Sequence, residues 1–262
     1  MISSKLIRPF FVFTGAALII AALACTPSEG SDDAERTYAD PNPFLYDDPR
    51  EAFDYMEERL INADSLYTGV IVDADSIFPV QLVAEVWGGQ NNQLRITAEG
   101  NMADFLAPAT LLLVSDGERM TGGRSSEIGF DTTTAPALRE AFAIGLSRMG
   151  LLHNLTRLYT GNPPDHADGG IDDWVQVHSF EWLDPEVVAR KLTRPMHFTI
   201  RINGEDTGEA TLYLRRETGL PMRRVQTIRL AGGSMTIEER YTGWAEIEAP
   251  EGTFDVDAAA FD

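Results

Sequence analysis

The pattern of apolar positions predicts that the folded part begins with one helix and continues as antiparallel strands. Apolar side chains recur every three or four residues over 51–61, the period of a helix with one apolar face. Apolar and polar residues alternate over 80–86 and 94–99, which predicts two strands joined by the glycine- and asparagine-rich residues 88–92. The run 111–114 is apolar on both sides, so we expect a strand that is covered on both faces.

The second half of the chain shows the strand pattern more regularly. Alternation predicts further strands, separated by turns such as Asn203–Gly204, at 196–202, 210–214, 222–230 and 235–244. Consecutive strands with no helix between them form a meander, and a long meander curls because strands twist. The predicted fold class is therefore α+β, with a long curved antiparallel sheet and helices that cover its concave face.

A helical segment over 135–159 separates the two groups of strands. Its apolar residues step by three or four positions, but Gly145 and Gly150 interrupt the pattern. Each glycine costs about 1 kcal/mol relative to alanine inside a helix. The segment is therefore either one helix or two shorter helices that meet near Gly150. Its apolar stripe fits two roles, a fixed element that closes the core or a movable lid over an apolar cavity.

The N-terminus predicts an exported chain with a lipid anchor. An apolar run at 10–24 follows Lys5 and Arg8 and precedes Cys25, the single cysteine of the chain. A cationic start, a short apolar run and small residues at the cleavage point are typical of a secretory signal, here residues 1–24. A lone exported thiol has no disulfide partner, which favours lipid attachment over an ordinary secretory signal with a chance cysteine.

The residues around this cysteine resemble the lipobox of bacterial lipoproteins, although Ala22 stands where leucine is usual. The resemblance implies that the Cys25 thiol is acylated and that the mature chain begins there. Thr26, rather than aspartate, follows the cysteine, which by the same resemblance indicates the periplasmic leaflet of the outer membrane. Residues 25–48 are acidic and rich in small residues, so we expect a flexible tether before a folded domain at 49–262.

Charge excludes one class of partner. The formal net charge is −20, and it becomes −22 without the signal, which carries two basic and no acidic residues. A nucleic-acid-binding protein needs a basic footprint, so we expect no nucleic-acid partner. So acidic a body is also disfavoured on anionic headgroups, which leaves the acyl anchor as the link to the membrane.

Three segments and the order of elements are similar to the LolA/LolB-like superfamily of periplasmic lipoprotein carriers, their receptor and related lipoproteins. The segments are the strand and turn at 112–117, the Thr-Gly-Leu-Pro turn within 218–223, and the closing 241–244. The likeness extends over about 50–256. It implies an incomplete β-barrel of about eleven strands around helices, with an interior that accepts acyl chains. The anchored chain resembles the receptor or the anchored lipid-binding relatives, and not the soluble carrier.

A curled sheet has a concave face that side chains or a ligand must fill, because an empty apolar cavity lowers stability. The same residues could instead form an ordinary core. The candidate ligand-binding residues are Trp87, Leu138, Phe142, Leu146, Met149, Leu152, Phe180, Trp182, Met196, Phe198, Ile200 and Leu212.

No motif predicts catalysis, a metal or a cofactor. The glycines of 145–150 are spaced one residue too far for a nucleophile elbow, and the four histidines lack the spacing of metal ligands. We therefore expect a non-enzymatic, membrane-anchored periplasmic protein that binds or transfers a lipid or an acylated lipoprotein. The alternative is a structural or assembly lipoprotein with a filled core, which acts through protein contacts at exposed Phe105, Leu106 and Leu111. A hydrolase would need converging carboxylates, which the spacing does not predict.

Overall fold

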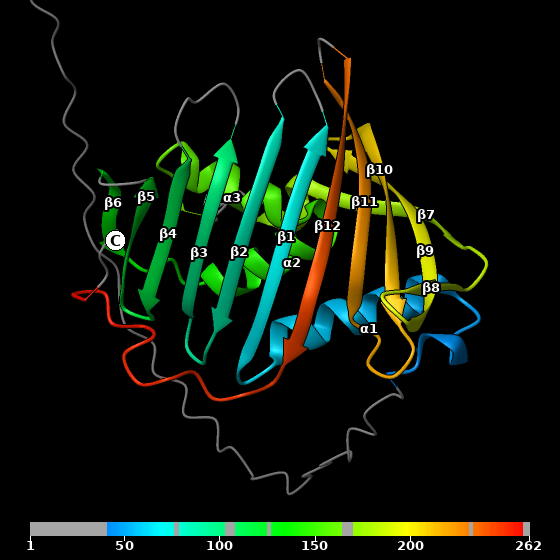
Figure 1. Ribbon diagram of the computed structural model, residues 1–262, viewed down its shortest axis with the longest axis horizontal. Helices are drawn as coiled ribbons and strands as arrows, with labels where there is room; N and C mark the ends of the chain where they lie inside the picture. Colours follow the sequence, from blue (N-terminus) through cyan, green and yellow to red (C-terminus); the bar gives the residue numbers. More distant parts are fainter. Residues whose placement is uncertain are drawn as a thin grey trace, which may run out of the picture. The chain divides into compact units, whose positions relative to one another are not determined.

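The computed structural model contains one antiparallel sheet of twelve strands that remains unclosed, as the sequence predicted (Figure 1). The structure describes residues 41–75, 79–102, 108–124, 127–163, 170–230 and 233–258. The predicted signal, Cys25 and most of the predicted tether lie outside these residues. The strand order is β6-β5-β4-β3-β2-β1-β12-β11-β10-β9-β7, and β8 pairs with β9 off this path.

The first six strands form one meander and the last six form another. Their bounds are β1 (Leu66–Asp75), β2 (Val80–Gly88), β3 (Gln93–Met102), β4 (Ala109–Asp116), β5 (Arg119–Arg124), β6 (Glu127–Thr133), β7 (Val175–Trp182), β8 (Glu186–Val188), β9 (Lys191–Ile202), β10 (Glu205–Arg215), β11 (Pro221–Leu230) and β12 (Gly233–Ala245). The first strand pairs with the last, from Tyr67 opposite Ala245 to Asp75 opposite Thr236, which joins the meanders into one sheet.

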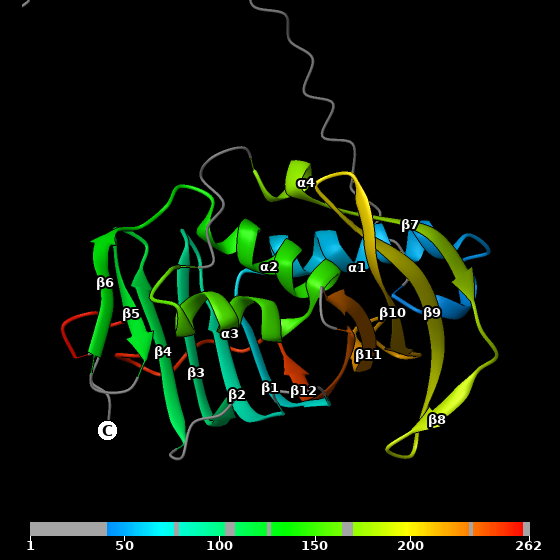
Figure 2. The same ribbon diagram turned by 90° about the horizontal axis from the view of Figure 1, so that it is seen from above.

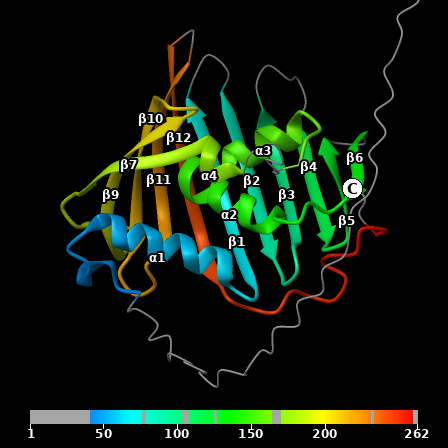
Figure 3. The same cartoon turned by 180° about the vertical axis from the view of Figure 1, so that it is seen from behind.

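This strand order forces the helical segment across the whole sheet. Because β6 and β7 lie at opposite ends of the order, the chain between them must travel from one edge to the other. It does so as α2 (Leu138–Met149), α3 (Leu151–Tyr159) and the short α4 (Ile171–Trp174). Figures 2 and 3 show the sheet curving around these helices, with α1 beside α2 on the same concave face.

The helix α1 (Pro49–Asn62) begins where the sequence predicts a start. The side chain of Asp48 accepts a hydrogen bond from the Arg50 amide at 2.8 Å, and Pro49 occupies the first position, where a missing N–H is not needed. Its buried apolar residues, Ala52, Phe53, Met56 and Leu60, recur at helical spacing and face the sheet. The predicted helix over 51–61 is confirmed.

The segment before α1 packs against the folded body over its last residues. A short 3-10 helix, η1 (Pro43–Leu45), precedes α1, and Pro43 is buried. The Arg194 guanidinium of β9 donates to the carbonyls of Pro43 and Tyr46 at 2.9 and 2.8 Å. Residues 41–48, which the sequence analysis gave to the tether, therefore pack against the folded body, through these carbonyls and through Pro43 and Tyr46.

The C-terminal segment explains why β4 is covered on both faces. Leu111 and Leu113 face the helices, whereas Leu112 and Val114 form a small cluster with Val256 on the other face. The strand prediction for 111–114 is confirmed, and the covering element is the chain that follows β12.

The helical segment breaks at Gly150, so the two-helix alternative is confirmed. Gly150 has a φ of +82° and a ψ of 169°, a combination that only glycine adopts readily. A Cβ atom built there would lie 2.7 Å from Glu239 Oε1, which stands directly beneath the break. Gly145, in contrast, lies buried within α2 and does not interrupt it. The break therefore has two causes, the backbone conformation and the carboxylate below it.

We expect Gly150→Ala to lower the free energy of unfolding by about 2 to 4 kcal/mol, because alanine is strained in this conformation and its methyl group would displace the Glu239 carboxylate. Gly204→Ala is the matched control, since Gly204 has a φ of +83° but nothing within 4 Å of a built Cβ. The control should lose only about 1 to 2 kcal/mol. Urea titration measures both, and equal losses would show that the Glu239 contact is unimportant.

Candidate functional site

Helix α2 lies between two apolar clusters and is the centre of the candidate site. On one side Leu138, Phe142 and Leu146, four residues apart, pack against the inward side chains of β1 to β5. On other sides Ile144 and Met149 pack with α1, β9 and β10. A helix that is apolar around most of its circumference is stable only when it is buried. The two clusters therefore depend on α2 to fill the space between them.

The structure gathers all the predicted ligand-binding residues except Trp87 into these two clusters. The first cluster, on β1 to β5 with α2 and α3, contains Leu138, Phe142, Leu146 and Leu152. The second, on α1, α2 and β7 to β10, contains Met149, Met196, Phe198, Ile200 and Leu212, with Phe180 and Trp182 partly buried at its edge.

The structure corrects the placement of Trp87. Side chains alternate along β2, and the buried face carries Val86 and Gly88, so Trp87 points to the opposite, convex face. There its ring packs against Tyr67, with ring centroids 4.3 Å apart. Trp87 therefore does not face α2.

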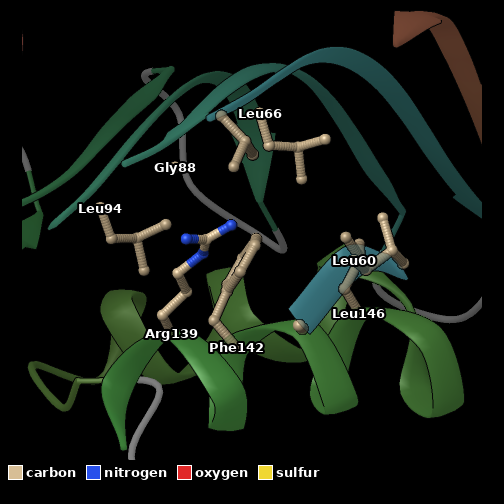
Figure 4. A pocket seen from close by; sticks show the side chains of 9 residues that line it. Leu60, Leu66, Gly88, Leu94, Arg139, Phe142 and Leu146 are labelled. Carbon is tan, nitrogen blue, oxygen red and sulfur yellow. The ribbon is translucent and has the colours of Figure 1, made fainter. Parts of the chain in front are cut away.

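The interior that the sequence analysis expected to be hollow is largely filled by side chains. Figure 4 shows a pocket between α2, the end of α1 and the strands β1 to β3. Its cavity volume is about 10 Å³, the room that one water molecule needs. No acyl chain fits there without movement of the helix. The pocket is lined by Leu60, Leu66, Val86, Gly88, Leu94, Arg139, Phe142, Ala143 and Leu146.

The C-terminal end of α2 is fixed to α1 by a nearly buried ion pair. The Arg148 guanidinium donates to both carboxylate oxygens of Glu57, at 2.9 Å from Nε and 2.6 Å from Nη2. The two side chains are only 12% and 10% exposed. The Ser147 hydroxyl also donates to Glu57. Because removal of one partner would leave a buried charge, this contact holds the two helices firmly together.

A second buried pair, Arg224 of β11 and Glu239 of β12, lies below the helix break. These residues face each other across the two strands. The guanidinium donates to the carbonyls of Ser147 and Arg148 at 2.7 and 2.6 Å, at the negative end of α2. The carboxylate accepts a hydrogen bond from the Leu152 amide at 3.0 Å, at the positive end of α3. Both helix ends are thus capped by side chains of the sheet.

Tyr241 completes this group of buried polar side chains. Its hydroxyl donates to Glu239 Oε2 at 2.8 Å. Burial raises the pKa of Tyr241 well above its usual value, and the Glu239 charge adds to the effect while Arg224 opposes it. The phenol therefore stays neutral, and its proton remains available to the carboxylate.

Two further observations concern the described residues only. None of their helices combines the length and the hydrophobicity that a membrane crossing requires. Their histidines, aspartates and glutamates form no group of three or more that could hold a metal ion.

Comparison with solved structures finds similar chains at low sequence identity. LprF from Mycobacterium bovis is 11% identical, with 77% of this chain and 95% of that chain covered and a TM-score of 0.46. The Mycobacterium tuberculosis lipoprotein LppX is 13% identical, with 77% and 99% covered and a TM-score of 0.40. A LolA superfamily protein from Nitrosomonas europaea is 10% identical, with 79% and 97% covered and a TM-score of 0.36.

The sequence matches no protein-family model and no curated protein.

Sequence reasoning missed Arg139, Arg224 and Glu239. One of them carried a visible signal, because Glu239 falls in phase with the inward-facing Ile237 and Tyr241 of β12. A carboxylate at an inward position of a strand must have a polar partner, so the phase alone could have indicated the buried pair.

The Tyr241 phenol predicts a loss of stability in alkali. The raised pKa in the folded state means that the stabilising contribution is complete below about pH 10 and is lost as the pH rises further, by up to about 1.4 kcal/mol per pH unit. Unfolding of wild type and Tyr241→Phe, compared at pH 8 and pH 11, measures this contribution. Wild type should lose more stability than the variant between the two values, and parallel losses would contradict the expectation.

Proposed function

We propose that this chain is a membrane-anchored protein of the cell envelope that binds a hydrophobic ligand, a lipid or an acylated protein, between α2 and the strands β1 to β3. The pocket under the first turns of α2 supports this proposal, because its walls are apolar and continue into the first cluster. Ligand would enter there by taking the place of α2 side chains. The proposal assigns no catalytic step to the chain.

The magnitudes favour a partial opening over removal of the whole helical segment. Withdrawal of Leu138, Phe142 and Leu146 from the core would cost about 5 to 9 kcal/mol. Burial of a sixteen-carbon acyl chain would return about 12 kcal/mol. Removal of α3 as well would expose its four buried leucines, which raises the cost to roughly 10 to 21 kcal/mol before any polar contact is broken. Displacement of α2 side chains without α3 is therefore the favoured route.

The polar contacts of α2 also indicate which end of the helix would move. Its C-terminal end is held by Glu57 and Arg224, which form buried charged contacts. Its N-terminal end begins at Ala137, which provides no side-chain cap, but Asn92 accepts a hydrogen bond from the Arg139 amide at 3.3 Å and donates to the Pro136 carbonyl at 2.8 Å. A helix end held by neutral hydrogen bonds is easier to detach than one fixed by buried charges. Movement would therefore begin at the N-terminal end and stop at the fixed end.

The anchor and the location belong to the same proposal. Acylated Cys25 would attach the chain to a membrane, and Thr26 after it would favour the periplasmic leaflet of the outer membrane. Transfer of the ligand to other lipoproteins would follow from binding at such a surface.

The filled interior favours a second candidate function, a structural or assembly lipoprotein that acts through protein contacts. One of the surface residues expected for that role is corrected by the structure, because Leu111 is fully buried against the helices. Phe105 and Leu106 lie outside the described residues. Absence of any bound or exchangeable lipid, together with a stoichiometric protein partner, would favour this candidate.

Gly88→Ala tests the site with a small change. A methyl group there would lie 3.7 Å from Leu66 Cβ and from Arg139 Nε, which is ordinary contact, so the fold should tolerate it. It would occupy the pocket, and we expect about ten-fold weaker binding of a fluorescent fatty acid. Stability should be unchanged or about 0.4 to 1 kcal/mol higher.

The full chain with Cys25→Ser, purified without detergent, is the background for this titration and for mass spectrometry of organic extracts. Gly243→Ala on β12 is the control, because nothing lies within 4 Å of a built Cβ there. Undiminished binding by Gly88→Ala, or equal losses in both variants, would place the ligand elsewhere.

A further inference from the structure

Arg139 is the charged side chain in an otherwise apolar pocket. It lies in the first turn of α2 and points with Phe142 toward the sheet, between Leu94 and Leu66 (Figure 4). A cation is unfavourable at this end of a helix, where the peptide dipoles already concentrate positive charge. Burial adds a second cost and lowers the pKa of Arg139, while the nearby Asp64 charge opposes the shift. A residue placed against both preferences is a candidate for function.

The present partners of Arg139 are neutral. Its Nη1 donates to the Gly89 carbonyl at 2.6 Å, and its Nη2 donates to the Ala63 carbonyl. Within the described part of the chain it forms no ion pair with a carboxylate, since Asp64 instead accepts a hydrogen bond from Gln90 Nε2 at 3.3 Å. A guanidinium has five N–H donors in a planar fork that fits two oxygens of one anion. Two carbonyl contacts leave this capacity largely unused.

The position of the two carbonyls suggests how an anion would act. Ala63 ends the helix α1, and Gly89 begins the turn between β2 and β3, so the Arg139 side chain ties the start of α2 to both. An anionic group that attracts the guanidinium would release these carbonyl contacts. The N-terminal half of α2, which the proposed function requires to move, would then lose the side-chain contacts of Arg139 when the ligand arrives and keep the neutral hydrogen bonds of Asn92 to the Arg139 amide and the Pro136 carbonyl.

We propose, on the basis of the function proposed above, that the pocket selects single-chain amphiphiles with an anionic head, a carboxylate or a phosphate, and that Arg139 binds that head while the acyl chain lies under α2. The overall charge of the chain repels anions, so selection depends on this half-buried cation at the pocket. A neutral chain of equal length gains only the apolar contacts.

Titration with dodecanoate, dodecyl phosphate and dodecanol tests the proposal on the full chain with Cys25→Ser. We expect the two anions to bind about ten- to a hundred-fold more tightly than the alcohol, because hydrogen bonds to a charged partner are the stronger kind. Arg139→Met should remove this preference and leave the binding of dodecanol within about two-fold. Arg139→Lys, which keeps the charge but loses the fork, should keep part of the preference.

Arg229→Met is the matched control, because it removes the same charge from an exposed position on β11 and should change nothing. Equal binding of the three probes by wild type would overturn the role of Arg139 and leave the proposed function in place. A preference that survives in Arg139→Met would also overturn it. Binding of none of the probes would overturn both proposals. The comparison of the three probes on wild type needs no variant to fold.

Discussion

The buried pair of Arg224 and Glu239 is the interaction on which the arrangement of helices and sheet depends. The two residues lie opposite each other on neighbouring strands. Their side chains bond to the helix ends on either side of Gly150, Arg224 to the end of α2 and Glu239 to the start of α3. The two opposite charges do not bond each other directly but share the buried space below the helix break, and each becomes costly once the other is lost. We infer that the pair fixes position: apolar surfaces tolerate sliding, whereas two capped helix ends fit only one register above the sheet.

The order of the strands explains why such a fixed point is needed. The chain leaves the first meander at one edge of the sheet and enters the second at the other edge, so α2 and α3 must cross the full concave face. A curved sheet cannot be followed by one straight helix of that length. The break at Gly150 lets the segment change direction, and the sheet side chains below it satisfy the amide and carbonyl groups that a break exposes.

The sequence predicted the elements with regular periods and missed those whose pattern is irregular. Alternation identified β2, β3, β9 and β10, and the helical period identified α1 and the divided segment. The sequence analysis missed the strand β5 because Gly122 and Gly123 carry no apolar side chain. The structure leaves no room for a side chain at Gly122, since a Cβ there would lie 2.6 Å from a carbonyl oxygen of β4. In β11 the phase misleads, because Arg224 and Gln226 face inward while Val225 faces outward.

The sequence predicted which apolar residues gather around α2, but it did not predict whether they leave a cavity or fill the interior. Leucine, methionine and phenylalanine at these positions line a cavity and fill a core equally well, so no pattern of residue types can tell the two apart. The polar residues show instead how firmly each end of α2 is attached to the rest of the fold. Charged contacts concentrate at the C-terminal end of α2, around Arg148, whereas its N-terminal end is held by the contacts of Arg139 with two carbonyls and by the neutral hydrogen bonds of Asn92. The proposed movement of α2 would therefore pivot about the end that the buried charges fix, and Arg139 and Phe142, nearer the other end, line the pocket.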